Sequence, residues 1–241
     1  KSDLYILGEV WHDSMPWLLG DQFDAVMNYP FTSNIHKLLA SQTITSQEFM
    51  DSMTTVIQSY PERVLDVTFN LVGSHDTSRI LTDCQEDKRR VKLIYTLLYT
   101  FMGSPCMYYG DEIGMTGGKD PGCRKCMEWD STKQDLDLFN HVKKLITLRS
   151  SEKLVANEGT FQFLNHKSTK LVVYRKYTST KNVLVLINPT AESESYILPF
   201  NIENQEVSDV WNNSTVQMSE SKETTIEPYG FSVLSFKGQL N

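Results

Sequence analysis

Residues 64–76 read VLDVTFNLVGSHD, an apolar run that ends in a glycine, a serine, a histidine and an aspartate. The apolar part predicts a strand within Val64–Val72, and the polar residues lie at its carboxyl end. Leu4–Glu9 repeats the arrangement, because a short apolar run there also ends in a carboxylate. Parallel α/β folds place their active face at the carboxyl ends of the strands. The stretch therefore predicts a parallel α/β fold whose polar residues gather at one edge.

Helical patterns alternate with such strands through the first 150 residues. Residues 45–48 read TSQE, the form of a capping box, and apolar residues follow on one helical face until Pro61. Further strands are expected over Phe23–Tyr29 and Cys106–Tyr109, a second helix from about Asp87 to Gly103, and a last helix that buries Leu138, Val142, Leu145 and Ile146. Four strand and helix units are half of the eight that a closed parallel barrel requires. Residues 1–150 are therefore predicted to form half of a TIM barrel.

The pattern changes after about Ser151 to short β-rich runs separated by turn residues. These runs are Phe161–Leu164, Leu171–Tyr174, Val183–Ile187, Tyr196–Leu198, Val207–Trp211 and Phe231–Phe236. Such spacing predicts a small antiparallel β-sandwich over residues 151–241. The polar stretch Asn212–Glu223 predicts a loop or an exposed hairpin.

Charge and composition exclude several classes of function. The chain has 23 basic and 30 acidic residues, a net charge of −7, so it lacks the basic surface that binds nucleic acid. No run approaches the ~20 apolar residues of a membrane span, and the start at Lys1 does not read as a signal peptide. Four cysteines in 241 residues do not make a disulfide framework, so reduced thiols and a cytoplasmic location are expected.

Two of these cysteines have the spacing of half a zinc site. Cys123 and Cys126 are separated by two residues, but Cys84 and Cys106 do not form a second such pair, and no pair of histidines supplies the other ligands. No metal site is therefore predicted on this chain.

Acidic and histidine side chains at the strand ends are candidates for acid and base catalysis. They are Glu9, the pair His75 and Asp76, and the pair Asp111 and Glu112. Two carboxylates that flank a glycosidic bond are the minimum that most glycosidases need. The pattern alone does not select a sugar over another substrate.

Longer motifs make that choice. Residues 8–13 (GEVWHD), 21–31 (DQFDAVMNYPF), 71–79 (LVGSHDTSR), 108–115 (YYGDEIGM) and 117–130 (GGKDPGCRKCMEWD) resemble the α-amylase family of glycoside hydrolases. Within it the chain is most similar to the cyclomaltodextrinase, neopullulanase and maltogenic amylase group. The resemblance covers essentially the whole chain. It implies strands five to eight of a (β/α)8 barrel, followed by the small antiparallel sandwich.

The resemblance also implies roles for individual residues at the reaction centre. Glu9 matches the family's general acid and base, at the end of the fifth barrel strand. Asp76 matches the carboxylate that binds sugar hydroxyls and stabilises the transition state, and His75 matches the histidine that hydrogen-bonds the same ring. Without the family, a His–Asp pair would be read as a structural hydrogen bond.

Substrate-binding roles are implied for three more residues. Asp120 and Arg124 match the pair that holds the sugar at the non-reducing side, although the same spacing also fits a surface salt bridge. Trp11 matches the aromatic residue at the reducing-side subsites, and a core tryptophan is the alternative. Asp111 and Glu112 are interpreted as supports of their loop.

One essential family residue has no match. The nucleophile of this family is an aspartate at the end of the fourth strand, and nothing before Leu4 supplies it. The chain is therefore expected to be the carboxyl-terminal portion of a retaining hydrolase of α-1,4-glucosidic bonds and to be inactive alone. Cyclodextrin, pullulan and malto-oligosaccharides stay open as substrates. The alternative is a non-catalytic amylase-like binding or scaffold domain.

Partners follow from the same interpretation. A half barrel exposes two sheet edges and its apolar inner face, so it is expected to bind the missing amino-terminal half or to self-associate. No cofactor is expected on this chain, and calcium stays open for the parent protein because the acidic loops here show no calcium-loop spacing. Trp211 and Tyr229 are read as core aromatics, with glycan binding as the alternative.

Overall fold

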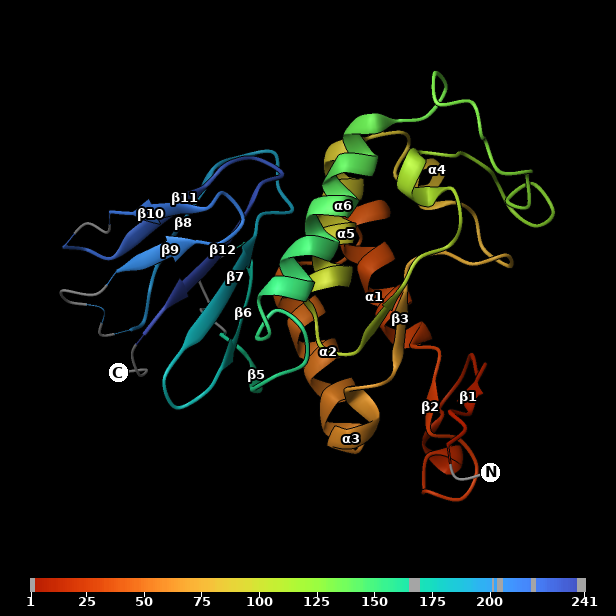
Figure 1. Ribbon diagram of the computed structural model, residues 1–241, viewed down its shortest axis with the longest axis horizontal. Coiled ribbons are helices and arrows are strands. Elements are labelled where there is room, and N and C mark those ends of the chain that lie inside the picture. Colours follow the sequence, from red (N-terminus) through yellow and green to blue (C-terminus); the bar gives the residue numbers. More distant parts are fainter. Residues whose placement is uncertain (1–2, 165–169, 201, 203–205, 218–219, 238–241) are drawn as a thin grey trace.

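The computed structural model describes residues 3–164, 170–200, 202, 206–217 and 220–237. Lys1 and Ser2, where the first domain is expected to start, and Met218 and Ser219 of the predicted loop lie outside the described residues. Long helices lie in the middle of the molecule, with an antiparallel sheet on one side and the short amino-terminal strands on the other (Figure 1).

Four short parallel strands follow one another through the first half of the chain. Their bounds are β1 (Leu7–Gly8), β2 (Ala25–Val26), β3 (Phe69–Leu71) and β4 (Ser104–Cys106). β1 pairs with β2 and β3 with β4, and a parallel bridge between Met27 and Phe69 joins the two pairs. The strands are therefore neighbours in the order in which they occur in the sequence.

Helical segments connect these strands. The α-helices are α1 (Tyr29–Ile35), α2 (Ser46–Ser59), α3 (Glu62–Leu65), α4 (Ile80–Asp83), α5 (Lys88–Thr100) and α6 (Leu136–Ser151). Two 3₁₀ turns, η1 (Met15–Trp17) and η3 (Asp111–Ile113), and a π-helical turn, η2 (His36–Ala40), complete the set. The predicted capping box is confirmed, because Thr45 and Glu48 exchange side-chain to backbone hydrogen bonds at the start of α2.

Several predicted strands are wrong in their bounds. The stretch Val64–Val72 does contain the predicted strand, which is β3, but the strand expected over Cys106–Tyr109 is confirmed only at Cys106, because β4 is Ser104–Cys106. The strand expected over Phe23–Tyr29 ends at Val26, and α1 begins at Tyr29. The local reason is clear in the second case: Asn28 accepts a hydrogen bond from the Phe31 amide, and proline is favoured in the first turn.

The long helices are predicted more accurately than the strands. Asp87 caps α5, as expected from the helical pattern that begins there. In α6, Leu138, Val142 and Leu145 are buried as expected, but Ile146 is 48% exposed. The predicted apolar face of α6 is therefore wrong at that position.

Two antiparallel sheets make up the second half. The larger has the order β10-β9-β12-β7-β6-β5, and the smaller pairs β11 with β8. Their bounds are β5 (Thr160–Phe163), β6 (Val172–Tyr177), β7 (Asn182–Ile187), β8 (Glu194–Ile197), β9 (Val207–Asp209), β10 (Ser214–Val216), β11 (Glu223–Ile226) and β12 (Phe231–Phe236). β10, inside the predicted polar loop, pairs with β9 as one arm of a hairpin.

The large sheet is buried on both faces, and this joins the two halves of the molecule. Along β6, Val172 and Tyr174 pack with the residues of α2, α5 and α6 in one core cluster. Val173, which points the other way, packs with Tyr196 of β8 and Ile226 of β11 in a second cluster. The helices therefore rest on one face of the sheet and the small sheet on the other.

Candidate active site

The polar residues that follow the four parallel strands lie at one edge of the fold. Glu9 follows β1, Tyr29 follows β2, Asp76 lies in the loop after β3, and Asp111 lies in the loop after β4. Because parallel strands share one direction, their carboxyl ends meet at a single edge. This geometry gathers side chains that are far apart in the sequence.

Glu9 is held by a residue that the sequence analysis missed. The hydroxyl of Tyr29 donates a hydrogen bond to Glu9 Oε1 at 3.0 Å. The ring of Trp11 stacks on the same tyrosine, with the ring centroids 3.6 Å apart and the planes 19° from parallel. Trp11 is 53% exposed, so it is not the core tryptophan considered as an alternative. Its outward face is free to contact a flat apolar surface such as that of a sugar ring.

Tyr29 also connects Glu9 with the loop after β3. Burial raises the pKa of the Tyr29 phenol well above its ordinary value, and the hydrogen bond to Glu9 and the charge of Glu9 raise it further. The side chain of Ser74 and the charge of Asp76 also act on this phenol, in opposite directions. Tyr29 therefore stays protonated, in contact with Glu9 and within reach of the charge of Asp76.

The remaining predicted site residues form one network of ion pairs. Asp76 Oδ2 lies 3.3 Å from His75 Nε2, and Asp76 Oδ1 lies 3.1 Å from Arg124 Nη2. Arg124 also pairs with Asp120, at 2.6 Å, and donates to the backbone carbonyl of His75. Cys123 Sγ donates to the same carbonyl at 3.1 Å. The structure thus brings the loop after β4 against the loop after β3. The side chains of His75, Asp76, Asp120 and Arg124 are each between one-third and just over one-half exposed.

Asp111 lies beneath this network. Its side chain is fully buried and accepts a hydrogen bond from Arg79 Nη1 at 2.9 Å. Burial raises the pKa of Asp111 to about 7, and the guanidinium of Arg79 opposes that rise. The sequence did not predict that Asp111 pairs with Arg79, because the two residues are 32 positions apart.

The arrangement offers the groups that acid and base chemistry at a sugar acetal needs. Glu9 is an exposed carboxyl in contact with a hydroxyl that can either donate or accept a proton in the hydrogen bond. Asp76 and Asp120 present carboxylate oxygens, and Arg124 presents N–H donors, toward solvent. Among the described residues, no group of three or more histidine, cysteine or acidic side chains has the arrangement that holds a metal ion.

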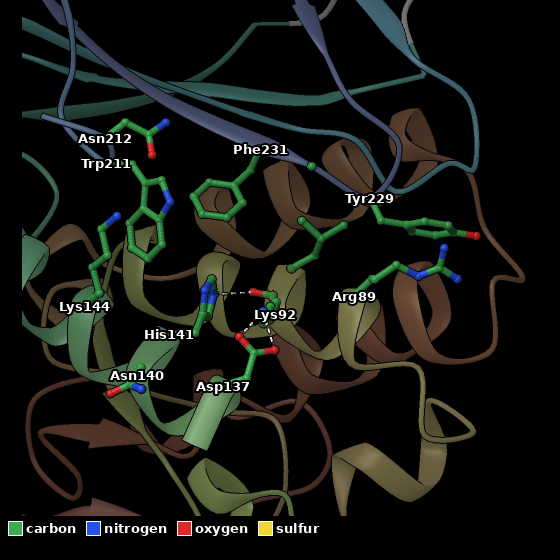
Figure 2. A pocket seen from close by; sticks show the side chains of 12 residues that line it. Arg89, Lys92, Asp137, Asn140, His141, Lys144, Trp211, Asn212, Tyr229 and Phe231 are labelled. Atoms are coloured by element: carbon green, nitrogen blue, oxygen red, sulfur yellow. Dashed lines mark hydrogen bonds and ion pairs between the residues drawn. The ribbon is translucent and has the colours of Figure 1, made fainter. Parts of the chain in front are cut away.

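Trp211 and Tyr229 lie apart from this edge, in a pocket of about 520 Å³ between α5, α6 and the large sheet (Figure 2). The ammonium of Lys144 sits 4.0 Å from the centre of the Trp211 ring, and the guanidinium of Arg89 sits 4.6 Å from that of Tyr229. His141 contacts Trp211 from another side. Each aromatic ring thus has a cation over one face, which leaves less of the ring free for a sugar.

Comparison with known proteins places these features in a family. The family model described as "Alpha amylase, catalytic domain" matches residues 1–148. A maltogenic alpha-amylase of Bacillus acidopullulyticus is 49% identical over 238 residues, which are 98% of this chain and 41% of that protein. A cyclomaltodextrinase of Geobacillus thermopakistaniensis is 43% identical over 232 residues, 96% of this chain and 40% of that protein.

The solved structures agree. A cyclomaltodextrinase structure matches with a TM-score of 0.88 and 39% sequence identity, over 96% of this chain and 40% of its own. This chain therefore spans about 40% of the length of these relatives. In the part of the chain that the structure covers, none of the helices combines the length and the apolar composition of a membrane span.

Proposed function

Because the chain belongs to the α-amylase family of glycoside hydrolases, we propose that it supplies the acid and base half of a retaining α-1,4-glucosidase site. Glu9 protonates the leaving oxygen and then activates water, and Asp76 binds sugar hydroxyls and stabilises the oxocarbenium-like transition state. The observation that supports this most directly is Tyr29, which bonds Glu9 and lies within electrostatic reach of Asp76. It ties the two carboxylates to one site.

We assign substrate-binding roles to four further residues. His75 and Arg124 flank Asp76, and Asp120 extends the network through Arg124. These three suit the hydroxyls of a terminal glucose unit, and the exposed ring of Trp11 suits its neighbour on the other side of the scissile bond. The substrate class is cyclodextrin, pullulan or malto-oligosaccharide. A purely non-catalytic scaffold would not require Glu9 to be paired with a buried phenol.

We further propose that residues 1–150 are strands five to eight of a (β/α)8 barrel and residues 151–241 a β-sandwich. The four strands pair in parallel and in chain order, as a barrel requires. Apolar side chains are exposed at two separate edges, Tyr5 and Ile6 beside β1 and Leu136, Phe139 and Ile146 on α6. The missing amino-terminal half of the barrel would cover both edges.

The nucleophile belongs, in this proposal, to that other half. A retaining mechanism needs a second carboxyl about 5 to 5.5 Å from the acid, and it forms the covalent glycosyl intermediate. The 241-residue chain alone is therefore expected to be inactive. We propose the cytoplasm as its location, on the ground of its four free thiols.

The test joins this chain to the part of the Bacillus acidopullulyticus maltogenic alpha-amylase that precedes the matched region. Release of reducing sugar from β-cyclodextrin is measured for the fusion and for the 241-residue chain. We expect turnover by the fusion only, and a loss of about 10³-fold in kcat for Glu9→Gln, since removal of a general acid costs ~10² to 10⁴.

Glu62→Gln is the matched control, because Glu62 is an exposed glutamate at the start of α3, away from the strand ends. It should leave kcat within twofold. Turnover by the isolated chain at the rate of the fusion, or a Glu9→Gln fusion that keeps its kcat, would show the proposal to be wrong.

A further inference from the structure

Arg79 is a fully buried arginine three residues after Asp76, and it contacts both ends of the loop that carries Arg124. The Arg79 amide donates to the carbonyl of Gly117 at 2.9 Å, and its Nε donates to the carbonyl of Cys123 at 3.0 Å. Gly117 and Cys123 are buried, whereas residues 118–122 between them are exposed. We call residues 117–124 the 117–124 loop.

The two ends of this loop lie against each other. A Cβ atom added to Gly117 would lie 2.5 Å from the carbonyl oxygen of Gly122 and 2.9 Å from the Cα of Cys123, closer than real side chains approach. Glycine at position 117 thus allows the loop to close on itself. Arg79 binds both ends of this closed loop, Gly117 through its backbone amide and Cys123 through its side-chain Nε.

Arg79 is itself fixed on its other side. Its Nη1 donates to the carbonyl of Tyr109 at 2.6 Å and to Asp111 Oδ1 at 2.9 Å. The rings of Tyr108 and Tyr109 stand 4.6 and 4.7 Å from the guanidinium carbon. A buried charge persists only when it is paired and hydrogen-bonded, and the planar fork of arginine makes several such bonds at once. Lysine cannot reproduce this set of contacts.

The contacts that orient Arg124 are too exposed to hold the loop by themselves. Arg124 is 45% exposed, and its partners Asp76 and Asp120 are 37% and 47% exposed. Exposed ion pairs contribute about 0 to 1 kcal/mol each, because water and salt screen them. The placement of Arg124 beside Asp76 therefore also depends on the buried end of the loop, where Cys123 Sγ donates to the His75 carbonyl and Arg79 Nε donates to the Cys123 carbonyl.

We propose that Arg79, anchored by Asp111, is the positioning residue that clamps the 117–124 loop and so sets Arg124 and Asp120 against Asp76. The effect of this clamp on substrate binding rests on the proposed function, in which Arg124 and Asp120 bind a terminal glucose unit. The clamp itself is a property of the fold and can be tested without any sugar.

The first test is hydrogen exchange of the 241-residue chain, followed by mass spectrometry. We expect Arg79→Lys to speed exchange in residues 117–124 at least tenfold and to leave α2 unchanged. The matched control is Arg90→Lys, because Arg90 is also buried and also binds carbonyls, those of Leu39, Ala40 and Cys84. This control should leave the 117–124 loop within twofold of the wild type.

The wild type provides a measurement that does not depend on whether a variant folds. The amides of Gly122 and Arg124 make short-range bonds in an exposed turn, to the carbonyls of Lys119 and Pro121. A clamped loop should protect them at least a hundredfold relative to an unfolded peptide. Unprotected exchange there, or a 117–124 loop that exchanges in Arg79→Lys as in the wild type, would overturn the clamp.

The second test is binding of maltotriose to the same chain by calorimetry. Arg79→Lys and Arg124→Ala should each weaken binding about tenfold, and the double variant should bind no more weakly than Arg79→Lys alone, since both changes remove the same contact. Additive losses would overturn the positioning role. If the wild type binds no maltotriose, the proposed function is at fault, and hydrogen exchange still decides the clamp.

Discussion

At the scale of single residues, burial controls the charge of His141. The side chain is 8% exposed, and its Nε2 donates to the carbonyl of Lys92 and lies 3.3 Å from the hydroxyl of Thr96. Burial lowers the pKa of His141 to about 4, from an ordinary value of 6.5. The folded protein therefore keeps this ring neutral at a pH where the unfolded chain protonates it.

The sign of the effect on stability follows. Between pH 6.5 and 4 the unfolded state binds a proton at His141 that the folded state does not bind, so the free energy of unfolding falls as the pH is lowered. The shift corresponds to at most about 3 kcal/mol. We expect urea unfolding of His141→Gln to lose less free energy between pH 7 and 4 than the wild type. His12→Gln, which removes an exposed histidine, should keep the wild-type dependence. Parallel pH profiles of His141→Gln and the wild type would contradict the prediction.

At the scale of an element, α2 has its own starting signal. Thr45 Oγ1 accepts from the amide of Glu48, and Glu48 Oε2 accepts from the amide of Thr45, so two otherwise unpaired amides are satisfied. Phe49, Met50 and Met53 then bury one face of the helix against the core. Packing provides most of the stability of the helix, and the cap determines where it begins.

Thr45→Ala is therefore expected to lower the free energy of unfolding by about 1 kcal/mol, the usual loss for a helix cap. Thr55→Ala is the control, because Thr55 is an exposed threonine inside the same helix whose hydroxyl only bonds Asp51 one turn back. It should be neutral or slightly stabilising. Chemical denaturation measures both. Equal losses in the two variants would mean that the capping box contributes nothing.

At the scale of the whole molecule, the exposed apolar edges predict self-association of the isolated chain. Tyr5 and Ile6 beside β1 are 45% and 47% exposed, and β1 lies at the edge of its sheet. A second copy of the chain can cover this edge. Sedimentation velocity should show a concentration-dependent rise in mass.

Ile6→Lys should weaken this association about tenfold or more, because burial of one isoleucine contributes roughly 1.5 to 3 kcal/mol. The matched control is Ile197→Lys, since Ile197 is 60% exposed in β8 of the small sheet, on the far side of the molecule. It should leave association unchanged. A wild type that stays monomeric at high concentration, or equal effects of the two variants, would contradict the prediction.

Features with local causes could be predicted from the sequence. The starts of α2 and α5 depend on caps made by Thr45 and Asp87 with amides two or three residues away. The alternation of strands and helices, with polar residues at the strand ends, depends on the order of residues along the chain. These patterns and the quoted motifs were sufficient to indicate the family and to name Glu9 and Asp76 as candidates.

Other features depend on residues that meet only when the chain has folded. Twenty positions separate Tyr29 from Glu9, and 44 separate Arg79 from the carbonyl of Cys123. Nothing in the local pattern distinguishes these side chains from ordinary core residues. Parallel pairing of the strands brings their loops together and so decides these contacts. The sequence by itself determined which chemical groups are available, and the tertiary structure decided which of them touch, because hydrogen bonds and ion pairs act only over a few ångströms in space.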